Sequence, residues 1–311
     1  MEARFTLRFS QAEDSPYDMA ATPVFAQDGL CFVACGSGLY RAGDAGASWE
    51  RLRASSESVT TAVAVSPAFA DDRSVFAAVK GGVLRSSDGG DNWYTASFPA
   101  PPPLFSSLIV SPDFARDGFL LASTLEDGVF SSTDRGLRWQ SWNFGLFDLS
   151  VLCLALSPAW SSDETVFAGT ETGLYRSANG GRAWRPTGFP TELAPVLSLA
   201  CLTDNRSATT RLLAGTESHG LLASCDRGET WKPLAADAIS GAVNQLQIWQ
   251  SEGADPSIYA LVEAGLLRSD DLGRTWDTLF RAPRAPSVML RAGDVILLGI
   301  PGDGVLRLSV S

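Results

Sequence analysis

A set of short apolar runs bounded by turn residues recurs along the chain, with a period of about 45 residues. Every such repeat opens with two apolar runs around a polar turn, as in "VAVSPAFADDRSVFAAV" (63–79) and "LALSPAWSSDETVFAGT" (154–170). A glycine then begins a third run such as "GVLRS", and a fourth run follows the tryptophan in "SDGGDNWYTAS" (87–97). No helical period of useful length competes, so the pattern predicts four β-strands per repeat, named A to D.

Seven glycines open a third strand, which gives seven repeats: Gly38, Gly82, Gly128, Gly173, Gly220, Gly265 and Gly304. The last repeat lacks its fourth strand, and "ARFTLRF" (3–9) can supply it. We therefore predict an all-β fold, a seven-bladed β-propeller of four-stranded antiparallel blades, closed by the N-terminal strand. The expected single domain spans 1–311, with blades at about 20–53, 60–98, 105–143, 150–188, 195–235, 242–280 and 286–311 plus 3–9.

The segment between strands C and D is the most regular part of the repeat. Ser269, Asp271, Gly273, Thr275 and Trp276 fit S-x-D-x-G-x-T-W at every position, and five other copies fit it in part. An aspartate can accept hydrogen bonds from its own turn, glycine allows a left-handed backbone, and tryptophan can cover the seam between blades. We interpret these residues as structural: Asp44, Asp88, Asp134, Asn179, Asp226, Asp271, Trp49, Trp93, Trp139, Trp184, Trp231 and Trp276.

This segment resembles the Asp-box, or BNR repeat, of a family of β-propellers. By size, blade number and box usage the chain is most similar to the photosystem II stability/assembly factor-like group, and less so to sialidases, sortilin-type receptors and xyloglucan-cleaving hydrolases. The resemblance implies a chaperone-like or assembly role. The sialidase motif F/Y-R-I-P is absent, since "FRAP" (280–283) comes late and lacks the isoleucine. One propeller is also half of the xyloglucan-cleaving architecture.

The formal net charge of −11 narrows the class of partner. Long-range repulsion disfavours binding to nucleic acid and to anionic membranes, whereas long-range attraction favours a basic protein partner. The N-terminus has no signal-peptide core and no apolar stretch reaches transmembrane length, so we expect a cytoplasmic protein without membrane insertion, or an exported one if a leader was trimmed. Five cysteines and one histidine form no zinc pattern; we expect free thiols, no metal, no cofactor and a monomer.

Function must lie in what differs between repeats. Four consecutive B-to-C loops place a glutamate at the matching position: Glu126, Glu171, Glu217 and Glu263. They are either solvated loop tips or a docking surface for a basic partner. The D-to-A crossovers share that face and contain apolar residues that are either tucked under the rim or exposed for binding. The candidates are Phe105, Phe144, Phe147, Phe189, Phe280 and Arg281.

A third series consists of arginines in strand C, at Arg41, Arg85, Arg176, Arg268 and Arg307. They could bind anions, but their regular recurrence favours bonds within or between blades. The sequence thus predicts a non-catalytic protein-binding scaffold or assembly factor that uses the face of the crossovers and B-to-C loops. The alternative is a carbohydrate-binding or glycoside-hydrolase-like propeller, with a carboxylate pair drawn from the glutamates.

Overall fold

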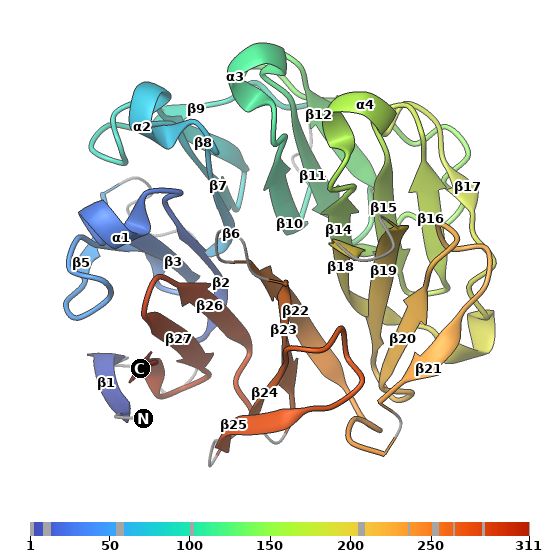
Figure 1. Ribbon diagram of the computed structural model, residues 1–311. Coiled ribbons are helices and arrows are strands. Elements are labelled where there is room, and N and C mark those ends of the chain that lie inside the picture. Colours follow the sequence, from blue (N-terminus) through green and yellow to red (C-terminus); the bar gives the residue numbers. More distant parts are fainter. Residues whose placement is uncertain are drawn as a thin grey trace. The chain divides into compact units, whose positions relative to one another are not determined.

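A computed structural model describes residues 3–8, 14–53, 59–99, 103–204, 209–235, 237–250, 255–263, 265–281 and 284–310. It contains seven four-stranded sheets, and in six of them the strands follow chain order. These sheets are the blades of an all-β, seven-bladed propeller, as predicted (Figure 1). The chain divides into two compact units, and the prediction of a single domain stays a prediction.

The first unit comprises Met1–Ala122, Phe130–Ser141 and Pro286–Ser311, and holds blades 1, 2, 3 and 7. Blade 1 is β2 (Pro16–Ala21), β3 (Cys31–Cys35), β4 (Gly38–Ala42) and β5 (Glu50–Arg51). Blade 2 is β6 (Thr60–Val65), β7 (Val75–Val79), β8 (Gly82–Ser86) and β9 (Tyr94–Thr95). Blade 3 is β10 (Phe105–Val110), β11 (Leu120–Thr124), β12 (Val129–Ser132) and β13 (Gln140–Ser141). Blade 1 thus begins earlier than the expected residue 20.

The seventh blade is built from both ends of the chain. It contains β26 (Val288–Ala292), β27 (Val295–Ile300) and β28 (Gly304–Ser309), and its fourth strand is β1 (Ala3–Arg8). β1 pairs antiparallel with β28 from Ala3 opposite Leu308 to Arg8 opposite Gly304. This confirms that the N-terminal strand completes the last blade, although Phe9 of the predicted strand lies outside the described residues.

The second unit comprises Ser123–Val129 and Trp142–Ala285, and holds blades 4, 5 and 6. Blade 4 is β14 (Val151–Leu156), β15 (Val166–Thr170), β16 (Leu174–Ser177) and β17 (Arg185–Pro186). Blade 5 is β18 (Val196–Asp204), β19 (Thr209–Thr216), β20 (Leu221–Ser224) and β21 (Lys232–Leu234), preceded by the 3-10 turn η1 (Thr191–Leu193). Blade 6 is β22 (Val243–Trp249), β23 (Ser257–Val262), β24 (Gly265–Ser269) and β25 (Asp277–Arg281).

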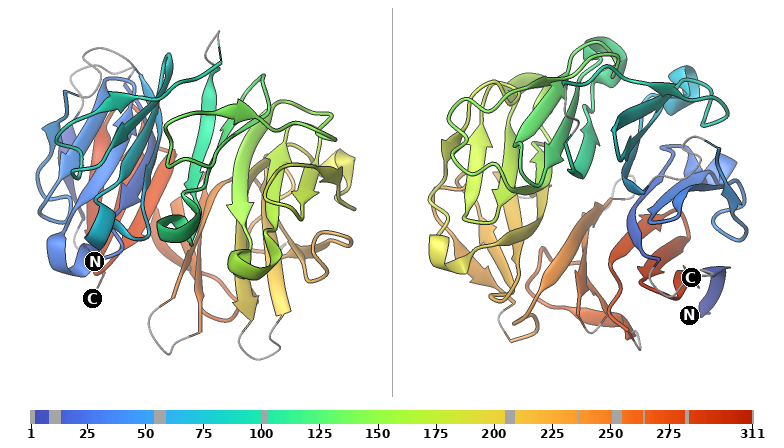
Figure 2. Two further views of the ribbon diagram at one scale, coloured as in Figure 1. Left: turned by 90° about the horizontal axis from the view of Figure 1, so that it is seen from above. Right: turned by 180° about the vertical axis from the view of Figure 1, so that it is seen from behind.

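One-turn helices, which the sequence pattern did not predict, occupy the A-to-B loops of four blades. They are α1 (Phe25–Asp28), α2 (Phe69–Asp72), α3 (Phe114–Asp117) and α4 (Trp160–Asp163). In α2, the terminal Asp72 accepts a 2.7 Å hydrogen bond from the Ser66 hydroxyl at the end of strand A, and the other three helices repeat this contact. Figure 2 (left) shows α1, α2 and α3 at the same end of their blades.

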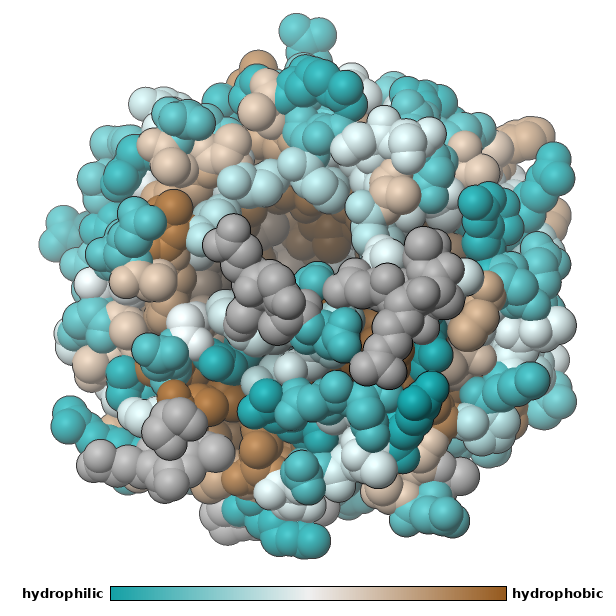
Figure 3. All heavy atoms as spheres, viewed as in Figure 1, coloured by the Kyte–Doolittle hydropathy of each residue, from teal (hydrophilic) through white to brown (hydrophobic). Residues whose placement is uncertain are grey.

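The box segments lie at that same end. In each of blades 1 to 4 a box backbone N–H donates to the residue after the helix, as in the bond from Gly89 N–H to Arg73 C=O (2.9 Å). On the face drawn in Figure 3, exposed side chains are mostly hydrophilic, with small apolar groups between them. The A-to-B loops and the boxes therefore share one end of these blades.

The box turn itself is closed by side-chain hydrogen bonds. In blade 6, Asp271 Oδ1 accepts from Ser269 Oγ (2.8 Å) and from the N–H of Arg274 and Thr275 (both 2.9 Å). Its Oδ2 accepts from Thr275 Oγ1 at 2.6 Å, and Ser269 Oγ accepts from the N–H of Gly273. Every oxygen of the aspartate is thus used by its own turn, which supports the structural interpretation of the box.

Box tryptophans pack in the seam between their own blade and the preceding one, as shown for Trp49, Trp93, Trp139, Trp231 and Trp276. Trp93 lies against the apolar cluster of Phe32, Leu52 and Val63, and Trp276 against that of blades 5 and 6. Within the described residues, five of the six indole N–H groups find an acceptor, and the Nε1 of Trp139 has none. The tryptophans therefore hold neighbouring blades together.

The five cysteines are free thiols. Burial raises the pKa of Cys31 and of Cys153 to about 12, so both behave as small apolar side chains. Among the residues that the structure describes, no group of three or more His, Cys, Asp or Glu side chains could hold a metal ion. No helix in the described ranges is long and apolar enough to cross a membrane.

Candidate functional site

The D-to-A crossover at residues 143–150, hereafter the aromatic crossover, is an irregular segment with a closely fixed backbone. Asn143 accepts a 2.8 Å bond from Val129 N–H and donates one to the C=O of Asp127. Ser150 Oγ donates to Leu125 C=O (2.8 Å), and Trp184 N–H donates to Phe144 C=O (2.8 Å). These bonds tie the crossover to the B-to-C loop of blade 3 and to the box of blade 4.

Asp148 fixes the other half of the crossover. Its Oδ2 accepts both the backbone N–H (2.9 Å) and the hydroxyl (2.6 Å) of Thr172, in the B-to-C loop of blade 4. Burial alone would raise the pKa of Asp148, but these hydrogen bonds outweigh it and lower the pKa below its ordinary value. The Asp148 carboxylate therefore stays ionised, and its hydrogen bonds hold the B-to-C loop of blade 4 against the crossover.

Two phenylalanines stand out from this fixed backbone. The side chains of Phe144 and Phe147 are 81% and 83% exposed, while Leu146 between them is buried. Gly145, between the two, has a positive φ of 80°, and a Cβ there would lie 2.2 Å from the backbone oxygen of Trp184. Because only glycine fits that approach, the crossover can lie flat on blade 4 and keep both rings in solvent.

The aromatic crossover and the two B-to-C loops that bond to it carry further exposed side chains, some apolar and some acidic. Leu125 (41% exposed) and Leu149 (38% exposed) add apolar area that the sequence did not single out. Glu126, Asp127 and Glu171 are exposed on the two B-to-C loops that hold the crossover. The backbone N–H of Glu171 donates to the C=O of Ser150, so Glu171 lies directly beside the crossover. The predicted sharing of a face by crossovers and B-to-C loops is confirmed at this point.

Four of the remaining sequence candidates lie in blades 5 and 6. Glu217 and Glu263 are exposed on the B-to-C loops of blades 5 and 6, and Glu217 N–H donates to Pro195 C=O of the adjacent crossover. Phe280 and Arg281 lie in strand β25 rather than in the crossover, opposite Leu266 and Gly265. Phe280 is half-buried there and Arg281 is exposed.

Phe105 and Phe189 are buried, so a partner could not contact them. Phe105 begins β10 and makes an edge-to-face contact with Phe98, which also stacks on Trp139 at 5.3 Å. Phe189 makes an edge-to-face contact with Trp231 at 5.2 Å. The two rings thus pack with the box tryptophans in small apolar clusters at the blade seams. The sequence pattern did not indicate which phenylalanines would pack against a tryptophan.

The arginines of strand C bond between blades in three of five cases, as the sequence favoured. Arg41 donates to Gly89 C=O (3.1 Å) and pairs with Asp91 (2.6 Å), both in the box of blade 2. Arg307 donates to Ala45 C=O in the box of blade 1 (2.9 Å). Arg176 lies 3.6 Å from Glu229 in the box of blade 5, a longer and looser pair.

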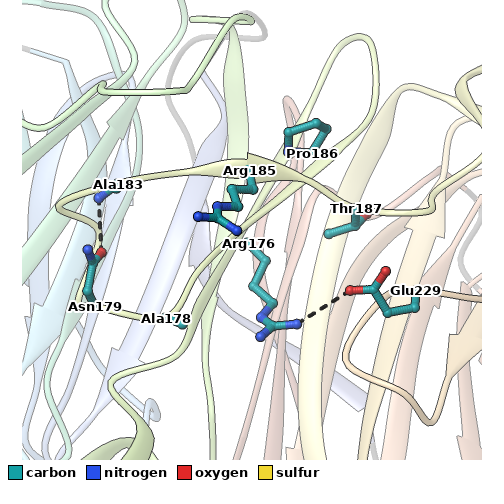
Figure 4. A pocket seen from close by; sticks show the side chains of 8 residues that line it. All are labelled: Arg176, Ala178, Asn179, Ala183, Arg185, Pro186, Thr187 and Glu229. Carbon is teal, nitrogen blue, oxygen red and sulfur yellow. Dashed lines mark hydrogen bonds and ion pairs between the residues drawn. The ribbon is translucent and has the colours of Figure 1, made fainter.

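A pocket of about 410 Å³ opens beside Arg176 (Figure 4). The pocket combines two guanidinium groups and a carboxylate with small apolar side chains. It is lined by Arg176, Ala178, Asn179, Ala183, Arg185, Pro186, Thr187 and Glu229. In Figure 4 the guanidinium of Arg176 reaches toward Glu229, and that of Arg185 lies on the same side of blade 4. The sequence did not predict this pocket, although Asn179 in place of the box aspartate marked blade 4 as different.

The fold is that of a seven-bladed β-propeller, and its aromatic crossover exposes two phenylalanine side chains. A scan of protein-family models found no match, and a search of curated proteins found none. YCF48 from Cyanidioschyzon merolae is similar in fold, with a TM-score of 0.69, 15% identity and coverage of 99% of this chain and 98% of that one. A structure of YCF48 bound to D1 peptide has a TM-score of 0.70, 17% identity and coverage of 100% and 95%.

Glycoside hydrolases share the fold as well. The GH74 enzyme of Niastella koreensis has a TM-score of 0.71 and 15% identity, over 96% of this chain and 43% of the enzyme. At these identities the likeness shows the fold alone. The propeller resemblance drawn from the sequence therefore agrees with the structures, both for the photosystem II assembly factor YCF48 and for the xyloglucan-cleaving enzymes.

Proposed function

We propose that the chain is a protein-binding scaffold, and that the aromatic crossover with the neighbouring B-to-C loops is its docking surface. The observation that carries the proposal is the pair Phe144 and Phe147, exposed above 80% on a backbone fixed by hydrogen bonds. Exposing two such rings to water is unfavourable for an isolated protein, whereas a rigid aromatic pair loses little entropy when a partner covers it.

Charge complementarity favours a partner segment that is basic and carries an apolar side chain. Glu126, Asp127 and Glu171 are exposed on the B-to-C loops that bond to the aromatic crossover, and the whole chain has a net charge of −11. A lysine or arginine of the partner would meet these carboxylates while an apolar side chain covers Phe144 and Phe147. That a protein of the same fold, YCF48, has been solved with a bound D1 peptide supports peptide recognition as a use of this scaffold.

The test is a binding screen on arrays of 12-residue peptides that differ in net charge at equal apolar content, with an oligosaccharide array in parallel. We expect basic, apolar peptides to bind the wild type, and the double variant F144S/F147S to bind at least about tenfold more weakly. The matched control is L137S, which removes an exposed apolar side chain (52% exposed) from a box. Equal binding by the double variant, or binding of sugars alone, would refute the proposal.

A further inference from the structure

Blade 4 differs from blades 1 and 6 at one register position of strands C and D. In blade 1 this cross-strand pair is Arg41 opposite Glu50, joined by a 2.6 Å ion pair. In blade 6 it is again an arginine opposite an acid, Arg268 and Asp277. In blade 4 it is Arg176 opposite Arg185. Blade 7 also has two arginines there, Arg307 opposite Arg4, and Arg307 donates to the C=O of Ala45. Like charges placed directly opposite each other on adjacent strands repel, so the blade-4 pair needs a compensating charge.

The chain supplies only part of the negative charge that would balance Arg176 and Arg185. Glu229 lies 3.6 Å from Arg176, and its side chain is 69% exposed. Across the described ranges, no hydrogen bond or ion pair engages Arg185, which is exposed at the pocket. Two guanidinium groups and one carboxylate leave the pocket with one positive charge.

A second departure removes a negative charge from the same pocket. The other five boxes carry an aspartate where blade 4 has Asn179, which lines the pocket. Asn179 Oδ1 accepts from Ser177 Oγ (2.8 Å) and Ala183 N–H (2.9 Å), so the box turn is kept without the charge. The amide Nδ2 of Asn179 is a donor that this turn does not use.

We propose that this blade-4 pocket binds a singly charged carboxylate, such as an acidic side chain of a peptide. One carboxylate would neutralise the remaining positive charge, and its two oxygens suit the forked N–H groups of guanidinium. The volume of about 410 Å³ accommodates the group together with part of its parent chain. Binding at this pocket does not depend on the aromatic crossover and would hold if the proposed function failed.

The experiment follows the Arg Nε–Hε signals of the full chain by NMR during titration with sodium acetate at constant ionic strength. We expect the signals of Arg176 and Arg185 to shift saturably, with a Kd on the order of millimolar. Sodium phosphate at the same ionic strength is the second arm. Phosphate should produce weaker shifts, because its second negative charge would exceed the one positive charge that the pocket has to neutralise.

Three variants decide the assignment. R185E restores the arrangement of Arg41 and Glu50, should fold, and should abolish the acetate effect. N179D returns the box aspartate and should weaken acetate binding about tenfold. K232A, at the same register position in blade 5, is the control and should bind like the wild type. Saturable binding that persists in R185E, shifts no larger than those in chloride, or binding of phosphate without acetate would each overturn the proposal.

Discussion

At the scale of single residues, the box aspartate and the side chain four positions later act as a pair. Asp88 Oδ2 accepts from Asn92, and Asp271 Oδ2 from Thr275, so the second carboxylate oxygen needs a donor there. In blade 4 the aspartate is Asn179 and the matching position is Ala183, which has no donor to offer. The two changes match each other within one turn. The Asn179 amide has only one acceptor oxygen, and the Ala183 side chain has no donor that would need a second one.

Substitutions of Asp271 test this reading. Partial burial opposes its ionisation, but hydrogen bonds from Thr275 and Ser269 outweigh that effect and lower its pKa to about 2. D271N should reduce the free energy of unfolding by about 1 kcal/mol, and D271A by about 2 kcal/mol, in urea denaturation at pH 7. N179A, which loses fewer bonds, is the matched comparison and should cost less than D271A. Equal costs for the two alanine variants would contradict the pairing.

At the scale of elements, the strand pattern was predictable and the detail at blade ends was not. Apolar runs bounded by turn residues and the recurring glycine of strand C predicted seven four-stranded blades, because each blade repeats one local pattern. Helices α1 to α4 were missed because four residues are too short for a helical period. The spacing from Ser66 to Asp72, repeated in four blades, was the available signal. Exposure of Phe144 could not be predicted, since it depends on bonds such as Asp148 to Thr172 between separate loops.

The seam between blades 1 and 2 contains a titratable contact. Asp18 in β2 accepts hydrogen bonds from Met19 N–H (2.8 Å) and from Val63 N–H (2.9 Å) of β6. Burial raises its pKa from 3.8 to about 7, against the lowering effect of these two bonds. The folded chain therefore keeps a proton on Asp18 that the unfolded chain releases near pH 4. Its contribution to stability is present below pH 4 and is lost as the pH rises toward 7.

The D18N variant isolates this contribution because asparagine does not titrate. Urea denaturation of both proteins at pH 4.5, 6 and 7.5 should show the wild type losing about 1–3 kcal/mol relative to D18N across the series. Other groups titrate equally in both proteins and cancel in the difference. If the free energy of unfolding changed with pH in the same way in both proteins, the pKa of Asp18 in the folded state would be that of an ordinary aspartate.

At the scale of the whole molecule, the net charge of −11 adds a long-range field to that of the carboxylates on the B-to-C loops beside the aromatic crossover. Attraction at distance raises association rates and is screened by salt, whereas contact with the rings is not. We expect a lysine-rich peptide to associate several-fold more slowly at roughly 0.3 M than at 0.05 M salt, with a smaller effect on dissociation. Stopped-flow fluorescence with a glutamate-rich peptide as control measures this.

The variant E126Q/E171Q separates the local charges from the field of the whole chain. It keeps most of the net charge, so the salt dependence of association should be reduced but still present. Duplex DNA should show no measurable binding to either protein, because its phosphates meet the same repulsion. Association of the lysine-rich peptide that is insensitive to salt would mean that the acidic surface does not guide the partner, and that the exposed rings act alone.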